Sequence, residues 1–325
     1  MSIPWSLFYI FIFPGILFTL SFAFFCQYVD RKLSARFQKR VGPPLLQPFA
    51  DFIKLLSKED IVPNAADKGM FSAVPIFGLA AVMTAFLYVP VFMSQSLLSF
   101  DGDLLMVLYL LTLPTLALFL AGWYSGNLFG QVGSMRTITQ LISYEIPFFI
   151  AMLAPALIVG SLNLAHIAEF QVAHYWLLPL TIIGFIVAIV SLQGKLERVP
   201  FDIPEAETEI VGGPLTEYSG RRLALFKLML SVEMVVGAAL IVVLFLGGSD
   251  MFFDTSGMAW YLAYIIGFAI FFFKVMLVVF VLALIKVAMA RIRIDQMVSF
   301  SYKFLIPLAL LQIAILLALK YLEFI

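Results

Sequence analysis

The chain has 325 residues, of which 63% are hydrophobic and 12% charged, and its formal net charge is zero. This composition is typical of an integral membrane protein and excludes a soluble domain; nothing in it indicates a nucleic-acid partner. A single cysteine, Cys26, excludes a disulfide framework and a thiolate metal cluster within the chain. The two histidines, His166 and His174, are expected at the surface and not as metal ligands. We therefore expect neither a cofactor nor a metal in this chain, so any electron chemistry belongs to a partner.

Eight segments are long and apolar enough to cross a hydrocarbon core, which needs about 20 residues per helix. They are residues 4–28, 70–93, 104–123, 138–160, 174–193, 224–246, 260–287 and 301–321. The first segment is too long for a signal peptide and has no basic residue before it. The expected fold is an all-α integral membrane protein with eight transmembrane helices, a single polytopic domain over residues 1–325.

The orientation of these helices follows from the lysines and arginines. Fifteen of the twenty lie in four connecting segments, residues 29–69, 124–137, 194–223 and 288–300. The alternate segments, residues 94–103, 161–173 and 247–259, hold none. Because basic loops stay on the cytoplasmic side, we expect both termini outside and every large loop in the cytoplasm, where partners dock.

An amphipathic helix is expected directly after the first span. Arg31 and Arg36 belong to a basic cluster whose simplest role is to touch anionic lipid headgroups. After Gly42-Pro43-Pro44, apolar residues recur every three or four positions as far as Leu56. The stretch is too short and too charged to span a membrane. It is therefore expected to lie in the cytoplasmic interface and to end by Pro63.

A dense group of acids lies between two spans: Glu197, Asp202, Glu205, Glu207, Glu209 and Glu217. In one interpretation Asp202 caps a helix, with Pro204 in its first turn and Glu205 completing a capping box. That leaves the other acids unexplained. If residues 203–211 are helical, Asp202, Glu205 and Glu209 share one face. Like charges on such a face raise one another's pKa, which allows proton exchange near neutral pH.

Three charged residues fall inside predicted spans: Glu145, Glu233 and Lys274. Glu145 precedes Pro147, which interrupts helix hydrogen bonding and makes room for water. Charges buried in a bilayer mark ion pathways. We therefore expect these residues and the loop acids to form a path from the cytoplasm to the midplane. Lysines near span ends, expected to reach the interface, are Lys286, Lys303 and Lys320.

The run Arg198–Gly220, RVPFDIPEAETEIVGGPLTEYSG, resembles the signature loop of a complex I family. That family includes NADH dehydrogenase subunit 1 and the membrane anchors of energy-converting [NiFe]-hydrogenases. Asp30-Arg31-Lys32, Leu46-Gln47-Pro48 and Arg291-Ile-Arg293-Ile-Asp295-Gln296 extend the resemblance. It implies that Asp202, Glu205, Glu207 and Glu217 line a cavity leading from a redox module into the membrane, and that Glu145 is the family's intramembrane glutamate. Charge partners or docking residues would be Arg31, Arg36, Arg198, Arg291, Arg293 and Asp295.

At two places the sequence departs from the pattern of the quinone-reducing complex I branch. There it resembles the hydrogenase branch and the related sulfane sulfur reductases. Gly42-Pro43-Pro44 runs almost directly into Leu46-Gln47-Pro48, and Gly213-Pro214-Leu215 precedes Thr-Glu-Tyr-Ser-Gly. The first departure shortens the region that forms part of the family's quinone-tunnel entrance, which argues against a quinone. The branch implies hydrogenase-like large and small subunits and antiporter-like membrane subunits as partners, in a prokaryotic cell membrane. Iron–sulfur clusters, and a NiFe centre in hydrogenases, would lie in those partners.

Two alternatives remain open at this point. The chain could be the quinone-site subunit of an NADH (or other donor):quinone oxidoreductase. It could also be a stand-alone secondary transporter, although no internal inverted repeat is seen. The terminal acceptor is a proton, a sulfur compound or a quinone, and the ion moved is H⁺ or Na⁺.

Overall fold

The computed structural model describes residues 8–91, 96–249 and 260–322, and all regular structure in these ranges is helical. This confirms the all-α expectation. Within the described ranges, seven helical runs are long and apolar enough to cross a membrane. The first, Phe8–Phe37, includes α2 (Ile16–Phe37), and the last, Ile294–Tyr321, joins α12 (Ile294–Phe300), the π-helical turn η2 (Ser301–Leu305) and α13 (Ile306–Tyr321). The others are α4 (Lys68–Leu87), α5 (Asp103–Tyr124), α6 (Leu128–Val159), α10 (Gly220–Leu246) and α11 (Trp260–Ala288).

The eighth predicted span, residues 174–193, is not confirmed as a full-length helix. It follows the short helix α7 (Leu164–Ala173) and contains most of α8 (Ile182–Lys195), which has 14 residues. At 1.5 Å per residue α8 is about 21 Å long, less than a hydrocarbon core of about 30 Å. Pro179 lies just before α8, where a helix cannot continue without a gap in its hydrogen bonds.

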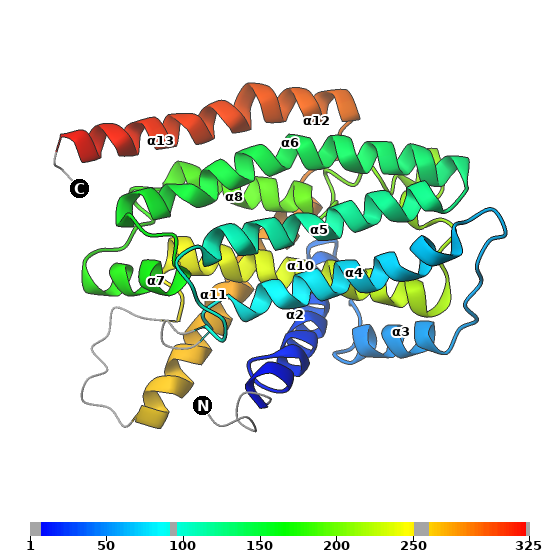
Figure 1. Ribbon diagram of the computed structural model, residues 1–325, viewed down its shortest axis with the longest axis horizontal. Coiled ribbons are helices and arrows are strands. Elements are labelled where there is room, and N and C mark those ends of the chain that lie inside the picture. Colours follow the sequence, from blue (N-terminus) through cyan, green and yellow to red (C-terminus); the bar gives the residue numbers. More distant parts are fainter. Residues whose placement is uncertain (1–7, 92–95, 250–259, 323–325) are drawn as a thin grey trace.

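Helix α10 forms the centre of the molecule and is almost wholly buried. It packs against α2, α4 and α11, while α5, α6 and α8 form the next group of helices. The last run lies along the outside of α6 and α8, and α2 and α11 run obliquely to the other long helices (Figure 1). Apolarity alone does not explain the place of α10, because α11 is more apolar and only 33% buried; contacts with α2, α4 and α11 enclose α10.

Several helices begin earlier or end later than hydropathy indicated. Helix α6 has 32 residues and begins at Leu128, where the Asn127 side chain accepts a hydrogen bond from the Phe129 N–H. The predicted loop 124–137 is therefore mostly helical. Likewise α2 continues to Phe37, beyond the predicted end at residue 28, because polar residues of a membrane helix can extend past the hydrocarbon core.

Helix α3 (Gln47–Leu56) lies where the amphipathic pattern predicts a helix. The Phe24 ring of α2 contacts Phe49 and Phe52, with ring centroids 5.8 and 5.5 Å apart. Other apolar residues of this region face outward, including Leu46, which is 70% exposed. An outward apolar face agrees with a place beside lipid, although the position of α3 in an interface stays a prediction.

The acidic segment is mostly irregular, so the condition for a shared helical face, a helix over residues 203–211, is not met. Only α9 (Glu207–Ile210) and the 3₁₀ turn η1 (Gly213–Leu215) are regular. The N-cap of α9 is Ala206, so Asp202 does not cap this helix. Gly213 has φ +54° and a Cβ there would lie 1.8 Å from the Pro204 carbonyl oxygen, so the segment folds back tightly on itself. The acids are therefore arranged by this turn and not by a shared helical face.

Candidate functional site

A buried ion triad joins three parts of the chain. Asp30 of α2 is 2% exposed, and its carboxylate lies 3.2 Å from Arg198 Nη1 and 3.1 Å from Lys286 Nζ of α11. The Lys286 side chain, which was expected to reach the interface, pairs with this buried carboxylate and is itself 31% exposed. Removing one member of such a group leaves an uncompensated buried charge.

Glu145 of α6 pairs with Lys195, the last residue of α8. The Lys195 ammonium lies 3.0 and 3.1 Å from the two carboxylate oxygens of Glu145. It also lies 5.7 Å from the centre of the Phe148 ring. Lys195 is 4% exposed, whereas the Glu145 side chain is 14% exposed, so the ammonium is buried and the carboxylate partly buried. Sequence analysis missed this role because Lys195 falls in a basic connecting segment, where a solvent-facing lysine is the usual interpretation.

Glu233 of α10 is fully buried beside this pair. Neither carboxylate oxygen has a hydrogen-bond partner among the described residues. Lys195, Glu145 and Arg198 all act on it electrostatically. Burying an ionised carboxylate without a hydrogen bond is very costly, so Glu233 requires a proton or bound water.

Glu197 connects the buried acids to the acidic segment. It lies just beyond α8, is buried, and has φ +50°, a conformation that costs energy for any residue other than glycine. Burial, with Glu205 and Glu233 nearby, raises the pKa of the Glu197 carboxyl well above its ordinary value. Glu197 was recognised in the sequence only as one acid of the segment. In the structure Glu197 interacts electrostatically with both Glu205 of the loop and Glu233 of α10.

Three acids of the segment have partners from other elements. Asp202 lies 2.7 Å from Arg291, just before α12. Glu209 lies 2.6 Å from Arg136 of α6, and Glu217 accepts a hydrogen bond from the Asn127 amide. These contacts hold the segment against the ends of α6 and α12. The side chain of Glu207 lies outside the described residues.

Lys274 is not part of the buried acid group. Its ammonium donates to the backbone carbonyls of Leu246 and Gly248, at 2.7 and 3.0 Å. These carbonyls end α10, where a cation is favourable because it compensates the helix dipole. Glu233 is 13 residues from Leu246 in the same helix, or about 20 Å. The structure therefore brings Lys274 to a helix end and Glu145 to Lys195.

The remaining predicted charge partners lie nearer the surface. Arg31 bonds Asp51 at 2.7 Å and so joins α2 to α3. This hydrogen bond from Arg31 lowers the pKa of the Asp51 carboxyl. Arg293 and Asp295 are exposed at the start of α12, where the Gln296 side chain accepts the Arg293 N–H at 3.2 Å. Arg36 is exposed in the last turn of α2.

A second charged cluster, missed in the sequence, fixes the end of the acidic segment. Asp60 binds Arg221 at 2.8 Å and Arg222 at 2.7 Å. Arg222 also donates to the Ser72 hydroxyl at 2.9 Å. Gly220, just before these arginines, has φ +55°, and a Cβ there would be 2.7 Å from the Glu59 carbonyl oxygen. The charged residues are visible in the sequence as Lys58-Glu59-Asp60 and Ser219-Gly220-Arg221-Arg222. No local pattern, however, indicates that segments about 160 positions apart form ion pairs.

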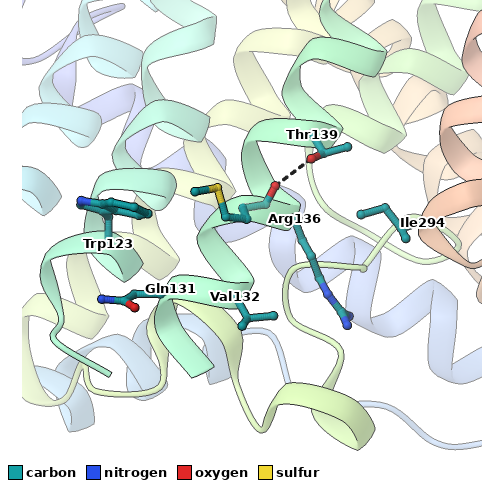
Figure 2. A pocket seen from close by; sticks show the side chains of 7 residues that line it. Trp123, Gln131, Val132, Arg136, Thr139 and Ile294 are labelled. Carbon is teal, nitrogen blue, oxygen red and sulfur yellow. Dashed lines mark hydrogen bonds between the residues drawn. The ribbon is translucent and has the colours of Figure 1, made fainter. Parts of the chain in front are cut away.

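Among the described residues, hollows beside these clusters include two with room for water. The larger, about 400 Å³, is a groove between the end of α5 and the start of α6 and is lined by Trp123, Gln131, Val132, Met135, Arg136, Thr139 and Ile294 (Figure 2). The smaller lies between α2, α3 and α10, beside Arg31 and Asp51, and measures about 20 Å³. That volume holds about one water molecule.

The helices and the charge pairs define a multi-pass membrane protein with acids and bases paired across helices. Residues 10–317 match the family described as NADH dehydrogenase. The chain belongs to this family, as the acidic-segment resemblance implied.

The relatives are named as subunits of respiratory complexes. The chain is 37% identical over 295 residues to a subunit of the NADH-quinone oxidoreductase of Dehalococcoides mccartyi, covering 89% of this chain and 80% of the relative. It is 38% identical over 300 residues to NADH-quinone oxidoreductase subunit 8 of Thermus thermophilus, covering 88% and 80%. The chain is accordingly a membrane subunit of a complex I-related complex.

Among solved structures, a chain of an archaeal respiratory membrane complex, the membrane-bound sulfane sulfur reductase, has the same fold. The TM-score is 0.83, over 96% of this chain and 98% of the other, at 23% sequence identity. Identity this low supports the shared fold and no more.

Proposed function

We propose that this subunit anchors a peripheral, hydrogenase-like redox arm and couples its electron transfer to proton or sodium translocation. One observation carries the proposal. The Glu145–Lys195 ion pair lies between α6 and α8, and the buried acids Glu233 and Glu197 interact electrostatically with this pair and with Glu205 of the loop. A series of buried acids and bases leading inward from a loop is what ion translocation requires.

The chemistry proposed for this series is redistribution of protons. Lys195 acts on both Glu145 and Glu233. Moving its ammonium toward one carboxylate withdraws charge compensation from the other, so a small displacement shifts a proton between them. Burial and the nearby Glu205 and Glu233 raise the pKa of Glu197, so this carboxyl binds a proton more readily than a free glutamate and would exchange it when the charge near Glu205 changes. A redox change in the docked arm would supply that change of charge.

The hydrogenase or sulfur-reductase branch is supported by the shortened Gly42-Pro43-Pro44 region and by Gly213-Pro214-Leu215. We propose hydrogenase-like large and small subunits and antiporter-like membrane subunits as partners. These would hold the iron–sulfur clusters and any NiFe centre. The location proposed is a prokaryotic cell membrane, with both termini outside.

A second candidate function is a quinone-site subunit. The names of the relatives at 37% and 38% identity favour it. In that case the region of α2, α3 and α10 would need to open for the quinone, and the coupling acids would have the same role.

One experiment separates the two. The intact complex is purified and tested for hydrogen evolution, polysulfide reduction and quinone reduction, with ion uptake measured in proteoliposomes. The first proposal expects ion uptake coupled to proton or polysulfide reduction. Coupled quinone reduction would favour the second. Turnover without ion uptake in sealed vesicles would contradict both.

A further inference from the structure

The last membrane-crossing run satisfies a backbone group that α6 cannot satisfy itself. Pro147 has no N–H, so the Ser143 carbonyl, four residues earlier, lacks its regular partner within α6. This carbonyl accepts a hydrogen bond from the Ser301 hydroxyl of η2. Both serines are buried. In a membrane such a carbonyl requires a protein partner or water, so this contact is not interchangeable with bulk solvent.

The turn that carries Ser301 is itself irregular. Ser301–Leu305 is π-helical and separates α12 from α13, with Pro307 following in the first turn of α13. A π-helical turn inside an α-helix changes which side chains face a neighbour and is frequent at functional sites. In this protein the π-helical turn lies beside Ser143 of α6, and Ser143 precedes Glu145 by two residues.

Two more side chains of the same run act in the same way. Gln312 donates to the Leu180 carbonyl at 2.7 Å, just before α8. Lys320 donates to the Leu157 carbonyl at 3.1 Å, in the last turn of α6. The run therefore bonds to the backbone of α6 and to the start of α8. These are the two helices that carry Glu145 and Lys195.

From this geometry we propose that Ser301 is a positioning residue for the Glu145–Lys195 pair. Its hydroxyl fixes the proline-interrupted turn of α6, and that turn sets the direction of Glu145 toward Lys195 of α8 and Glu233 of α10. Ser301 acts through the backbone and does not itself carry a proton. The proposal rests on the proposed coupling function of the pair. It adds that a residue of a different helical run sets the geometry of this pair.

The first test is a double-mutant cycle on the proteoliposome complex. Ser301→Ala should lower ions moved per electron at least about threefold, the bias that one ordinary hydrogen bond exerts, whereas Ser301→Thr should keep the wild-type ratio. Pro147→Ala supplies a new N–H for the Ser143 carbonyl. In that background Ser301→Ala should have little further effect. An equal effect of Ser301→Ala in both backgrounds would overturn the proposal.

The second test does not depend on coupling. The infrared carboxyl band of Glu145, identified by its loss in Glu145→Gln, is titrated in the purified complex. Ser301→Ala should move its midpoint by about half a pH unit or more. If that variant does not assemble, Ser301→Cys, a much weaker donor, replaces it. The matched control is Ser134→Ala, which removes a buried α6 hydroxyl bonded within its own helix at 2.9 Å.

The two tests distinguish the possible failures. An unshifted band in the Ser301 variants contradicts the positioning role whatever happens to ion transport. A shifted band together with normal coupling in Glu145→Gln supports positioning and contradicts the proposed function of the pair.

Discussion

Lys195 is the residue on which the buried charges converge. It bonds both carboxylate oxygens of Glu145 and acts on Glu233, although it belongs to neither helix. A lysine at the end of a short helix can reach inward between two longer ones. The end of α8 at Lys195 therefore places this ammonium between α6 and α10.

Glu145→Gln is expected to leave the complex assembled while ions moved per electron fall. The neutral amide keeps the shape but loses a charge-assisted hydrogen bond, which is worth roughly 1.5–3 kcal/mol. Proteoliposome ion uptake against electron turnover measures the ratio. Lys303→Gln, an exposed lysine of η2, serves as the control and should change nothing. An unchanged ratio in Glu145→Gln would assign that residue a structural role only.

The raised pKa of Glu197 predicts a pH dependence of stability. A carboxyl whose pKa is raised on folding binds its proton more tightly in the native state. Its contribution is complete below the unfolded pKa, near 4.5, and is lost as pH rises toward the native pKa. The Tm of the detergent-solubilised complex should therefore fall with pH through this window. Glu197→Gln should lessen the fall, and parallel curves for the two proteins would contradict the assignment.

Asp30→Asn should destabilise the complex by on the order of 3 kcal/mol, because Arg198 and Lys286 would share no carboxylate. The comparison is Arg31→Gln, which breaks a half-exposed pair and should cost less than about 1 kcal/mol. Thermal unfolding of the two variants provides the ranking. Equal losses would mean that the Asp30 triad is hydrated in the assembled complex.

At the scale of elements, the contact between the first basic loop and the start of α10 is a fixed joint. Gly220→Ala should destabilise it by about 2 kcal/mol or more, since φ is +55° and the new Cβ would overlap the Glu59 carbonyl. Gly267→Ala in α11 is the matched control, because its nearest atom would be 3.5 Å away. That change should be neutral or slightly stabilising in the same Tm assay. Similar Tm values for both would show that the joint is flexible.

At the scale of the whole molecule, the charge asymmetry of the loops predicts sidedness. Cysteines introduced at the exposed positions Asp101 and Lys39 should react with an impermeant reagent from opposite faces of sealed cells. The native Cys26 is buried and should contribute little background. Labelling of both positions from the same side would contradict the expected arrangement of the termini.

The sequence by itself determined the class of fold, the place of most spans and the family. Hydrophobicity is a local property, and a helix of about 20 apolar residues has few alternatives to a bilayer. The acidic segment identified the family because its residues are contiguous. The pattern also located α3, whose amphipathic period needs no distant contact.

Only the tertiary structure decided which charges meet. Glu145 and Lys195 are 50 positions apart, and Asp30 and Lys286 are 256 apart, so no spacing along the chain predicts either pair. The shape of the acidic segment also depended on close packing around Gly213, which overrode the helix that residues 203–211 suggested. Helix propensity is weak beside such contacts, whereas a buried charge must find its partner wherever the fold brings one.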